Sequence, residues 1–186
     1  MREATSIVSN TGPLISMEKM DRGYDFIRRL YGQVIIPPTV LAEVAADTFE
    51  TPQAYLQHYG IVDLIEVRSV PQSVSLPEIE RLHQGEIEAI QLALALQLPL
   101  LIEETVGRRV AQQVGLRISG MAGQITAALR RNVISANEAR RQLGALLRGG
   151  RINRNMYNAL IADVSISSYP PLSTMSSKAS QAAPDG

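Results

Sequence analysis

SIVSNTGPLI, residues 6–15, changes from a strand pattern to a helix pattern at its centre. The β-branched run that ends at Ser9 favours a short strand. Asn10 and Thr11 then offer capping side chains, and Pro13 suits the first turn of a helix, where the N–H that proline lacks is not needed. A strand that leads directly into a helix predicts the opening unit of an α/β fold.

The rest of the chain repeats this alternation of short apolar strands and amphipathic helices. Leu98–Ile102 is fully apolar apart from Pro99, as expected of a parallel strand buried on both faces. We therefore predict an α/β protein with three layers, α/β/α, around a mostly parallel central sheet. Strands are expected at 6–9, 33–36, 61–67, 98–102 and 116–119, and helices near 14–17, 24–30, 39–46, 86–96, 105–114, 121–130, 136–147 and 155–164.

Composition limits both the size and the chemistry of the protein. The 186 residues fit one domain, and 45% hydrophobic residues with only two Phe and no Trp predict an aliphatic core. We place this domain at residues 1–164 and predict a disordered tail at 165–186, where Ser, Pro and Ala dominate. The absence of cysteine excludes disulfides, thiol catalysis and Cys-ligated metals.

The sequence gives no sign of a membrane protein. Its longest apolar stretch, residues 89–102, is interrupted by Gln91, Gln97 and Pro99. It is shorter than the roughly 18–20 residues that a membrane span requires. The N-terminus has no secretory hydrophobic region. We expect a cytoplasmic protein with no membrane partner.

The formal net charge is zero, but the two signs are unevenly distributed along the chain. Residues 1–104 carry seven Lys/Arg and fifteen Asp/Glu, whereas residues 105–186 carry eleven Lys/Arg and three Asp/Glu. Such a division is a hint of a nucleic-acid surface. The alternative is that the two halves neutralise each other across the fold, and both interpretations stay open at this stage.

Several side chains with oxygen ligands stand where strands end or helices begin. Ligands collect at the carboxyl ends of the strands in open α/β sheets, so these side chains can converge there. Carboxylates and waters are the ligands that hard divalent cations prefer, and clustered carboxylates repel one another without such a cation. The candidates are Asn10 after the first strand, Glu43 after Pro37-Pro38, Glu86 and Glu88 at a helix start, and Glu103 and Glu104 after Ile102.

Each candidate also has a purely structural interpretation. Asn10 and Thr11 are suited to capping the first helix. An acid such as Glu86 is favoured at a helix N-terminus without any metal. The remaining positions fit ordinary surface roles, with Glu43 and Glu88 solvated, Glu103 and Glu104 near the start of the next helix, Arg109 in a surface ion pair, and His58 and His83 exposed.

The order and spacing of four motifs resemble the PIN domain family, and a bacterial subgroup related to VapC-type toxins. The similarity covers roughly residues 6–130, and the helices in 131–164 complete the domain. The motifs are VSNTGPLI at 8–15, IIPPTVLAEV at 35–44, GEIEAI at 85–90 and LLIEE at 100–104, followed by Arg109, Ala111 and the glycine-containing segment 116–123.

This resemblance implies a Mg²⁺- or Mn²⁺-dependent ribonuclease with four acidic positions. They fall on Asn10, Glu43, Glu86, and Glu103 or Glu104. The resemblance further implies that Thr11 orients a ligand or water through its hydroxyl. Arg109 would hold an RNA phosphate or pair with a neighbouring carboxylate.

The chain departs from the family pattern at two positions. The pattern prefers Asp at the first position, and Asn10 supplies a neutral oxygen instead. It also prefers Asp at the fourth, where glutamate reaches one methylene further. We expect an endoribonuclease that acts as the toxin of a toxin–antitoxin pair, with RNA as substrate, a small antitoxin protein as partner and a homodimer as assembly. The alternative is a PIN-like domain with a decayed site that binds RNA or the antitoxin.

Overall fold

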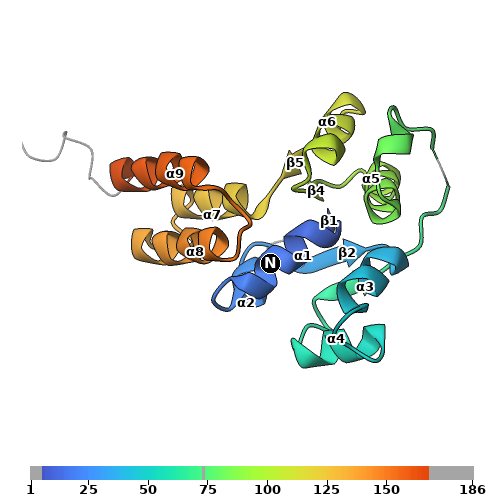
Figure 1. Cartoon of the computed structure of the whole chain (residues 1–186), viewed down its shortest axis with the longest axis horizontal. Helices are drawn as coiled ribbons and strands as arrows, with labels where there is room; N and C mark the ends of the chain where they lie inside the picture. The colour runs from blue at the N-terminus through green and yellow to red at the C-terminus, as the bar shows by residue number, and fades with distance from the viewer. Residues whose placement is uncertain (1–5, 73, 168–186) are drawn as a thin grey trace, which may run out of the picture.

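The computed structural model describes residues 6–72 and 74–167 of the chain (Figure 1). Short strands alternate with helices from the N-terminus to Ser119, and helices alone follow. The elements are β1 (Ser6–Ser9), α1 (Thr11–Lys19), α2 (Gly23–Arg28), β2 (Gln33–Ile36), α3 (Pro38–Ala45), α4 (Pro52–His58), β3 (Ile65–Val67), the 3₁₀ turn η1 (Ile79–Arg81), α5 (Gln84–Leu96), β4 (Leu100–Leu101), α6 (Thr105–Gln113), β5 (Ile118–Ser119), α7 (Met121–Arg130), α8 (Ala136–Arg148) and α9 (Arg154–Ser167).

All five strands run parallel in the order β3-β2-β1-β4-β5. Val8 in the central strand pairs with Ile35 of β2 on one side and with Leu100 of β4 on the other. The chain therefore builds outward from β1 to β3 and then returns across the sheet to β4. The point where the direction of winding reverses lies between β1 and β4.

Successive residues of a strand contribute side chains to two separate hydrophobic cores, because side chains alternate between the two faces of a sheet. Ile7 packs in the larger core with α1 to α4 and α7 to α9, and Val8 packs in the smaller core with α5 and α6. The same alternation places Leu101 in the larger core and Leu100 in the smaller. The prediction of three layers, α/β/α, is confirmed, and the sheet is parallel throughout.

The structure corrects the sequence predictions at two places between α3 and η1. Only Ile65–Val67 of the predicted strand 61–67 is a strand, because Ile61 and Leu64 turn inward and are buried instead. The helix α4 was not predicted, although Thr51 caps it by accepting a hydrogen bond from the Ala54 N–H at 3.1 Å. Its apolar face is short, with only Tyr55 and Leu56 buried.

The C-terminal end of the domain lies slightly beyond the predicted boundary at 165. Helix α9 continues to Ser167, and the rest of the predicted tail, residues 168–186, lies outside the described residues. None of the helices in the described part of the chain is long and apolar enough to cross a membrane.

Candidate metal and RNA-cleavage site

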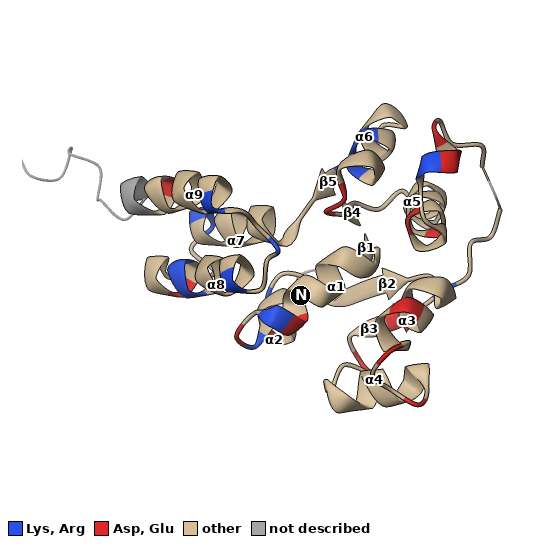
Figure 2. Cartoon of the chain, viewed as in Figure 1, with Lys and Arg blue, Asp and Glu red and all other residues tan. Residues whose placement is uncertain are grey.

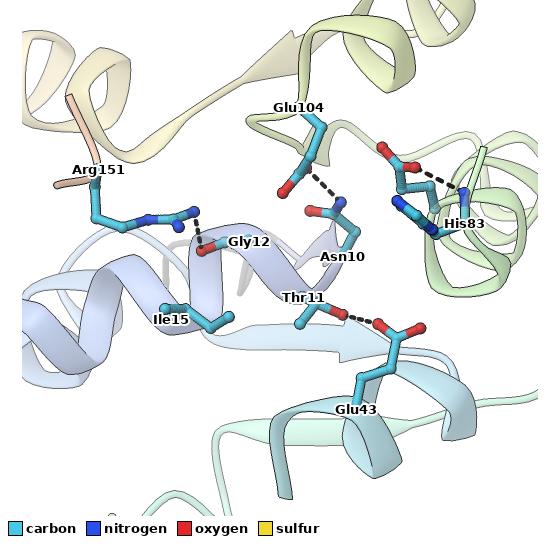
Figure 3. Close-up of a pocket in the computed structure, with 9 residues that line it drawn as sticks. Asn10, Thr11, Gly12, Ile15, Glu43, His83, Glu104 and Arg151 are labelled. Atoms are coloured by element: carbon cyan, nitrogen blue, oxygen red, sulfur yellow. Dashed lines mark hydrogen bonds between the residues drawn. The ribbon is translucent and has the colours of Figure 1, made fainter. Parts of the chain in front are cut away.

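A pocket of about 330 Å³ opens beyond the carboxyl ends of β1 and β4 (Figure 3). This is the position where the winding of the sheet reverses, and ligands of open α/β sheets bind at such a position. Residues from five separate segments of the sequence meet there. They are Asn10, Thr11, Gly12 and Ile15 from the start of α1, Glu43 from α3, His83 and Glu86 from the start of α5, Glu104 after β4, and Arg151 after α8.

Asn10 occupies the N-cap position of α1 but does not act as a cap through its side chain. The residue is buried, and its Nδ2 donates to Oε2 of Glu104 at 2.8 Å. Its Oδ1 is buried and has no hydrogen-bonding partner among the described residues. A buried oxygen without a hydrogen-bonding partner lowers the stability of the fold, so we expect this atom to bind a ligand that the protein itself does not supply.

The two carboxylate oxygens of Glu86 have different surroundings. Its Oε2 accepts the backbone N–H of His83 at 2.9 Å, which fixes the start of α5. Its Oε1 is buried without a partner in the described part of the chain. Burial raises the pKa of this carboxyl, the His83 N–H opposes the rise, and the charges of Glu104 and Glu43 add to it. A bound cation would relieve both the missing bond and the repulsion.

Glu43 and Glu104 complete the acidic wall of the pocket. Thr11 donates its hydroxyl proton to Oε2 of Glu43, and Figure 3 shows this bond below the Asn10–Glu104 bond. The two polar residues at the start of α1 therefore each hold one carboxylate in place. Glu43 is exposed, whereas Glu86 at the back of the pocket is only 6% exposed.

Each of the three pocket carboxylates rests against a glycine. A Cβ added to Gly85 would lie 2.6 Å from Oε2 of Glu43, and one added to Gly107 would lie 2.6 Å from Oε1 of Glu86. A Cβ on Gly12 would meet Oε1 of Glu104 even more closely. A side chain at any of these three positions would therefore displace the neighbouring carboxylate from its observed place.

The structure does not bring Glu103 into this pocket. Its Oε2 accepts hydrogen bonds from Ser16 Oγ and from Arg151 Nη2, each at 2.7 Å, and its Oε1 accepts the Met121 N–H at 3.1 Å. Neighbouring residues of an extended segment point in opposite directions, so only one of Glu103 and Glu104 can face the pocket. The geometry therefore assigns the fourth acidic position to Glu104 and gives Glu103 a structural ion pair.

Arg109 and Glu88 also lie away from the pocket. Arg109 forms an ion pair with Glu78, with its Nη2 at 2.6 Å from Oε2. Of the two roles expected for Arg109, the structure therefore shows the second, pairing with a neighbouring carboxylate. Glu88 accepts a hydrogen bond from Gln84 one helical turn earlier. His83 is exposed, as its structural interpretation predicts, but it lines the pocket beside Glu86.

Arg151 is the pocket residue that the sequence did not indicate. It follows α8 and reaches back to the start of α1, where it donates to Gly12 O at 3.1 Å and to Ser16 Oγ at 2.8 Å. Its sequence neighbours carry no motif, and the ion pair with Glu103 adds to these bonds in holding it at the site. It gives the rim of an otherwise acidic pocket a positive charge.

Ion pairs also join the two oppositely charged parts of the chain. Glu78 pairs with Arg109 and Glu103 with Arg151, so part of the charge asymmetry is neutralised across the fold. Arg29 and Glu138 pair in the opposite sense. Figure 2 nevertheless shows acidic residues on α3, on α5 and after β4, with basic residues on α6 and α8.

The donor set of the pocket fits a hard divalent cation. It consists of oxygen atoms, and two of them, Asn10 Oδ1 and Glu86 Oε1, are buried without partners. No group of three or more acidic or histidine side chains in residues 6–72 and 74–167 lies close enough together to hold an ion alone. An ion would need the Asn10 amide oxygen or water to complete its shell.

A family model described as PIN domain matches residues 6–165. The chain belongs to the PIN domain family. Among solved structures, it is similar to a PilT N-terminus domain protein from the hyperthermophilic archaeon Sulfolobus solfataricus P2, with 17% identity and a TM-score of 0.47 over 67% of this chain and 94% of that chain. No curated protein matches it.

PIN domains are typically nucleases and generally use divalent metal ions. Membership of the PIN domain family therefore indicates the class of chemistry to expect at the pocket between β1 and β4.

Proposed function

We propose that this PIN domain is an endoribonuclease that depends on Mg²⁺ or Mn²⁺. The observation that carries the proposal is the pair of buried oxygens without partners, Asn10 Oδ1 and Glu86 Oε1, in one pocket with two further carboxylates. Asn10, Glu43, Glu86 and Glu104 would hold the ion, directly or through water. A neutral amide at one of four positions lowers the charge of the site but still supplies a ligand oxygen.

The residues around the pocket have separable roles in such a reaction. A bound divalent ion supplies activation of the attacking water and stabilisation of charge on the scissile phosphate. Thr11 orients Glu43 through its hydroxyl, and Asn10 Nδ2 orients Glu104. Burial raises the pKa of Glu86 in the metal-free protein, so binding of an ion would release any proton that this carboxyl holds. Arg151 at the rim offers a cation to an RNA phosphate.

We extend the proposal to the role of a VapC-like toxin. It is supported by the resemblance of the motifs at 8–15 and 35–44 to that subgroup. A small antitoxin protein would then cover the acidic pocket, and the toxin would act as a homodimer. Expression of the chain alone should arrest bacterial growth, and co-expression of a small neighbouring reading frame should relieve the arrest.

The second candidate is a decayed PIN-like domain that binds RNA or an antitoxin without cleaving. The bond from Asn10 Nδ2 to Glu104 favours it, because a carboxylate satisfied by an amide needs a cation less. The two candidates differ in whether Asn10 is a working ligand or a replacement for one.

A cleavage assay with metal-binding calorimetry separates them. Single-stranded and structured RNA should be incubated with Mn²⁺ or Mg²⁺ and with the wild type, Glu86→Gln or Asn10→Asp. Glu88→Gln is the matched control, since Glu88 lies on the same helix and outside the pocket. If Glu86 is a ligand, its Gln variant should lose about 100-fold or more in cleavage rate, and Glu88→Gln should keep the wild-type rate.

The outcomes lead to different conclusions. Cleavage by the wild type that Glu86→Gln abolishes supports the enzyme. No cleavage by the wild type, with cleavage gained by Asn10→Asp, supports the decayed site. If neither the wild type nor Asn10→Asp binds Mn²⁺, the metal-dependent proposal is wrong.

A further inference from the structure

A second cavity of about 460 Å³ lies beside the acidic pocket, between the start of α7 and helix α9. Helices α7 and α9 are drawn next to each other in Figure 1, and they are in contact. The cavity has an apolar part and a cationic part. The apolar part includes Ile118, Met121, Met156 and Leu160, and the cations are Arg108 and Arg151. Glu103 also lines the cavity, and its carboxylate is paired with Arg151.

Arg151 connects this cavity to the acidic pocket, because it lines both. Its Nε and Nη2 are engaged with Ser16, Gly12 and Glu103. Its Nη1 has no hydrogen-bonding partner among the described residues. The guanidinium is therefore held rigidly from one side while two of its N–H groups remain available to a ligand.

Arg108 supplies the second cation from helix α6. Its Nη1 donates to Ile102 O at 2.9 Å, which anchors the side chain against the end of β4. Within the described residues its Nε and Nη2 have no hydrogen-bonding partner, and it takes part in no ion pair. Arg108 is thus placed as a cation without an acidic partner, unlike its neighbour Arg109, which is paired with Glu78.

This combination of surfaces matches a nucleotide. A cavity of this size lies in the range of small-ligand sites. Apolar side chains and guanidinium planes pack against the faces of an unstacked base, and guanidinium N–H groups bind phosphate oxygens. Met156, 47% exposed at the cavity, is an apolar side chain without a full covering.

We propose that the cavity between α7 and α9 is a nucleotide subsite that takes the base adjacent to the scissile phosphate, with Arg108 and Arg151 binding the flanking phosphates. This inference rests on the proposed RNA-cleaving function of the acidic pocket, which the subsite adjoins through Arg151. It gives the C-terminal helices a part in substrate binding, in addition to closing the larger core.

Methionine-methyl NMR tests whether a base enters the cavity. Each of the four nucleoside 5′-monophosphates is added to the ¹³C-methyl-Met protein, and inorganic phosphate is added separately. At least one nucleotide should shift the Met156 methyl, while the buried Met17 and Met20 of the α1 region stay unchanged as internal controls. No Met156 shift with any nucleotide, or an equal shift with inorganic phosphate, overturns the proposal.

Affinity for RNA tests the cations and separates the subsite from the cleavage reaction. Binding of a labelled single-stranded RNA is measured by anisotropy with Ca²⁺ in place of Mg²⁺. Arg108→Gln should weaken binding about fivefold and lower the salt slope by about 0.7, as expected for one lost phosphate contact. Met156→Glu, at an exposed position that tolerates the change, should weaken it at least as much. Arg141→Gln, exposed on α8 and outside this cavity, is the matched control.

Unchanged RNA affinity in both variants overturns the subsite, even if they lose binding to an antitoxin protein. A wild type that cleaves RNA but is insensitive to Arg108→Gln contradicts the subsite alone. A wild type that never cleaves, but whose RNA affinity falls in both variants, supports the subsite and contradicts the proposed nuclease.

Discussion

Glu103 and Glu104 are neighbours in the sequence, but their side chains point in opposite directions and have different partners in the structure. Glu103 accepts hydrogen bonds from Ser16, Arg151 and the Met121 N–H, so its charge is compensated by the protein itself. Glu104 lies in the acidic pocket, where its Oε2 is held by Asn10 Nδ2 and its Oε1 rests against Gly12. One carboxylate is part of the fold, and the other lies in a space that a ligand can enter.

The difference shows how a structural acid is distinguished from a candidate ligand. A carboxylate with a paired cation and several donors stabilises the fold, because removal of one partner leaves the others unsatisfied. A pocket is destabilised until a cation binds if its carboxylates lie close to one another, to glycines and to buried oxygens without hydrogen-bonding partners. Three sets of substitutions test this contrast.

The largest effect is expected from removal of each glutamate in turn. Glu103→Ala leaves the partly buried Arg151 without its ion pair and should lower the free energy of unfolding by about 2–3 kcal/mol. Glu104→Ala removes a repelling charge and should change stability by less than about 1 kcal/mol while weakening Mn²⁺ binding. Urea unfolding and calorimetry measure the two quantities. Equal losses of stability in both variants would remove the distinction between them.

The glycines behind the carboxylates give the next largest effect. Gly85→Ala pushes its new methyl group against the Glu43 carboxylate, and Gly12→Ala does the same to Glu104. Each should weaken Mn²⁺ binding about tenfold, as displacement of a single ligand does, without loss of stability. Gly144→Ala on α8 is the control, since its methyl group would meet only the tip of Arg148 and should raise stability by about 0.5–1 kcal/mol. Unaltered Mn²⁺ affinity in both pocket variants would show that the glycines do not position the carboxylates.

The smallest effect is the pH dependence that Glu86 contributes to the metal-free protein. Burial raises the pKa of its carboxyl in the folded state, so the folded state holds the proton more tightly than the unfolded chain. Its contribution to stability is fully present below the ordinary pKa of 4.5 and is lost as the pH rises through the raised value.

Urea unfolding in EDTA at a series of pH values measures this contribution as the difference between wild type and Glu86→Gln. Carboxylates that do not interact with Glu86 cancel in that difference, including Asp63, whose pKa is lowered by the hydrogen bond from Arg28. The stability of the wild type should fall relative to the variant as the pH rises, and Mn²⁺ should restore it. If the difference in free energy of unfolding between wild type and Glu86→Gln does not vary with pH, the pKa of Glu86 is not raised in the metal-free protein.

Much of the site was predictable because strand ends and helix starts are visible in the sequence. The β-branched run before Asn10 and the apolar run before Glu103 and Glu104 place these residues at the same edge of a parallel sheet. The predictions failed where the direction of a side chain decides the role. The pattern does not show that Glu103 turns toward Arg151, or that Asn10 leaves its capping role and donates to Glu104.

The alternation of strands and helices, the parallel sheet and membership of the PIN family could be read from the amino-acid sequence, because they depend on local periodicity and on the order of motifs. The packing of the layers was needed to show that Glu104 rather than Glu103 faces the pocket, that three glycines lie against the carboxylates, and that Arg151 arrives from beyond α8. These features depend on contacts between residues far apart in the chain. Burial, charge compensation and the space left by a missing Cβ are set only when the layers pack together.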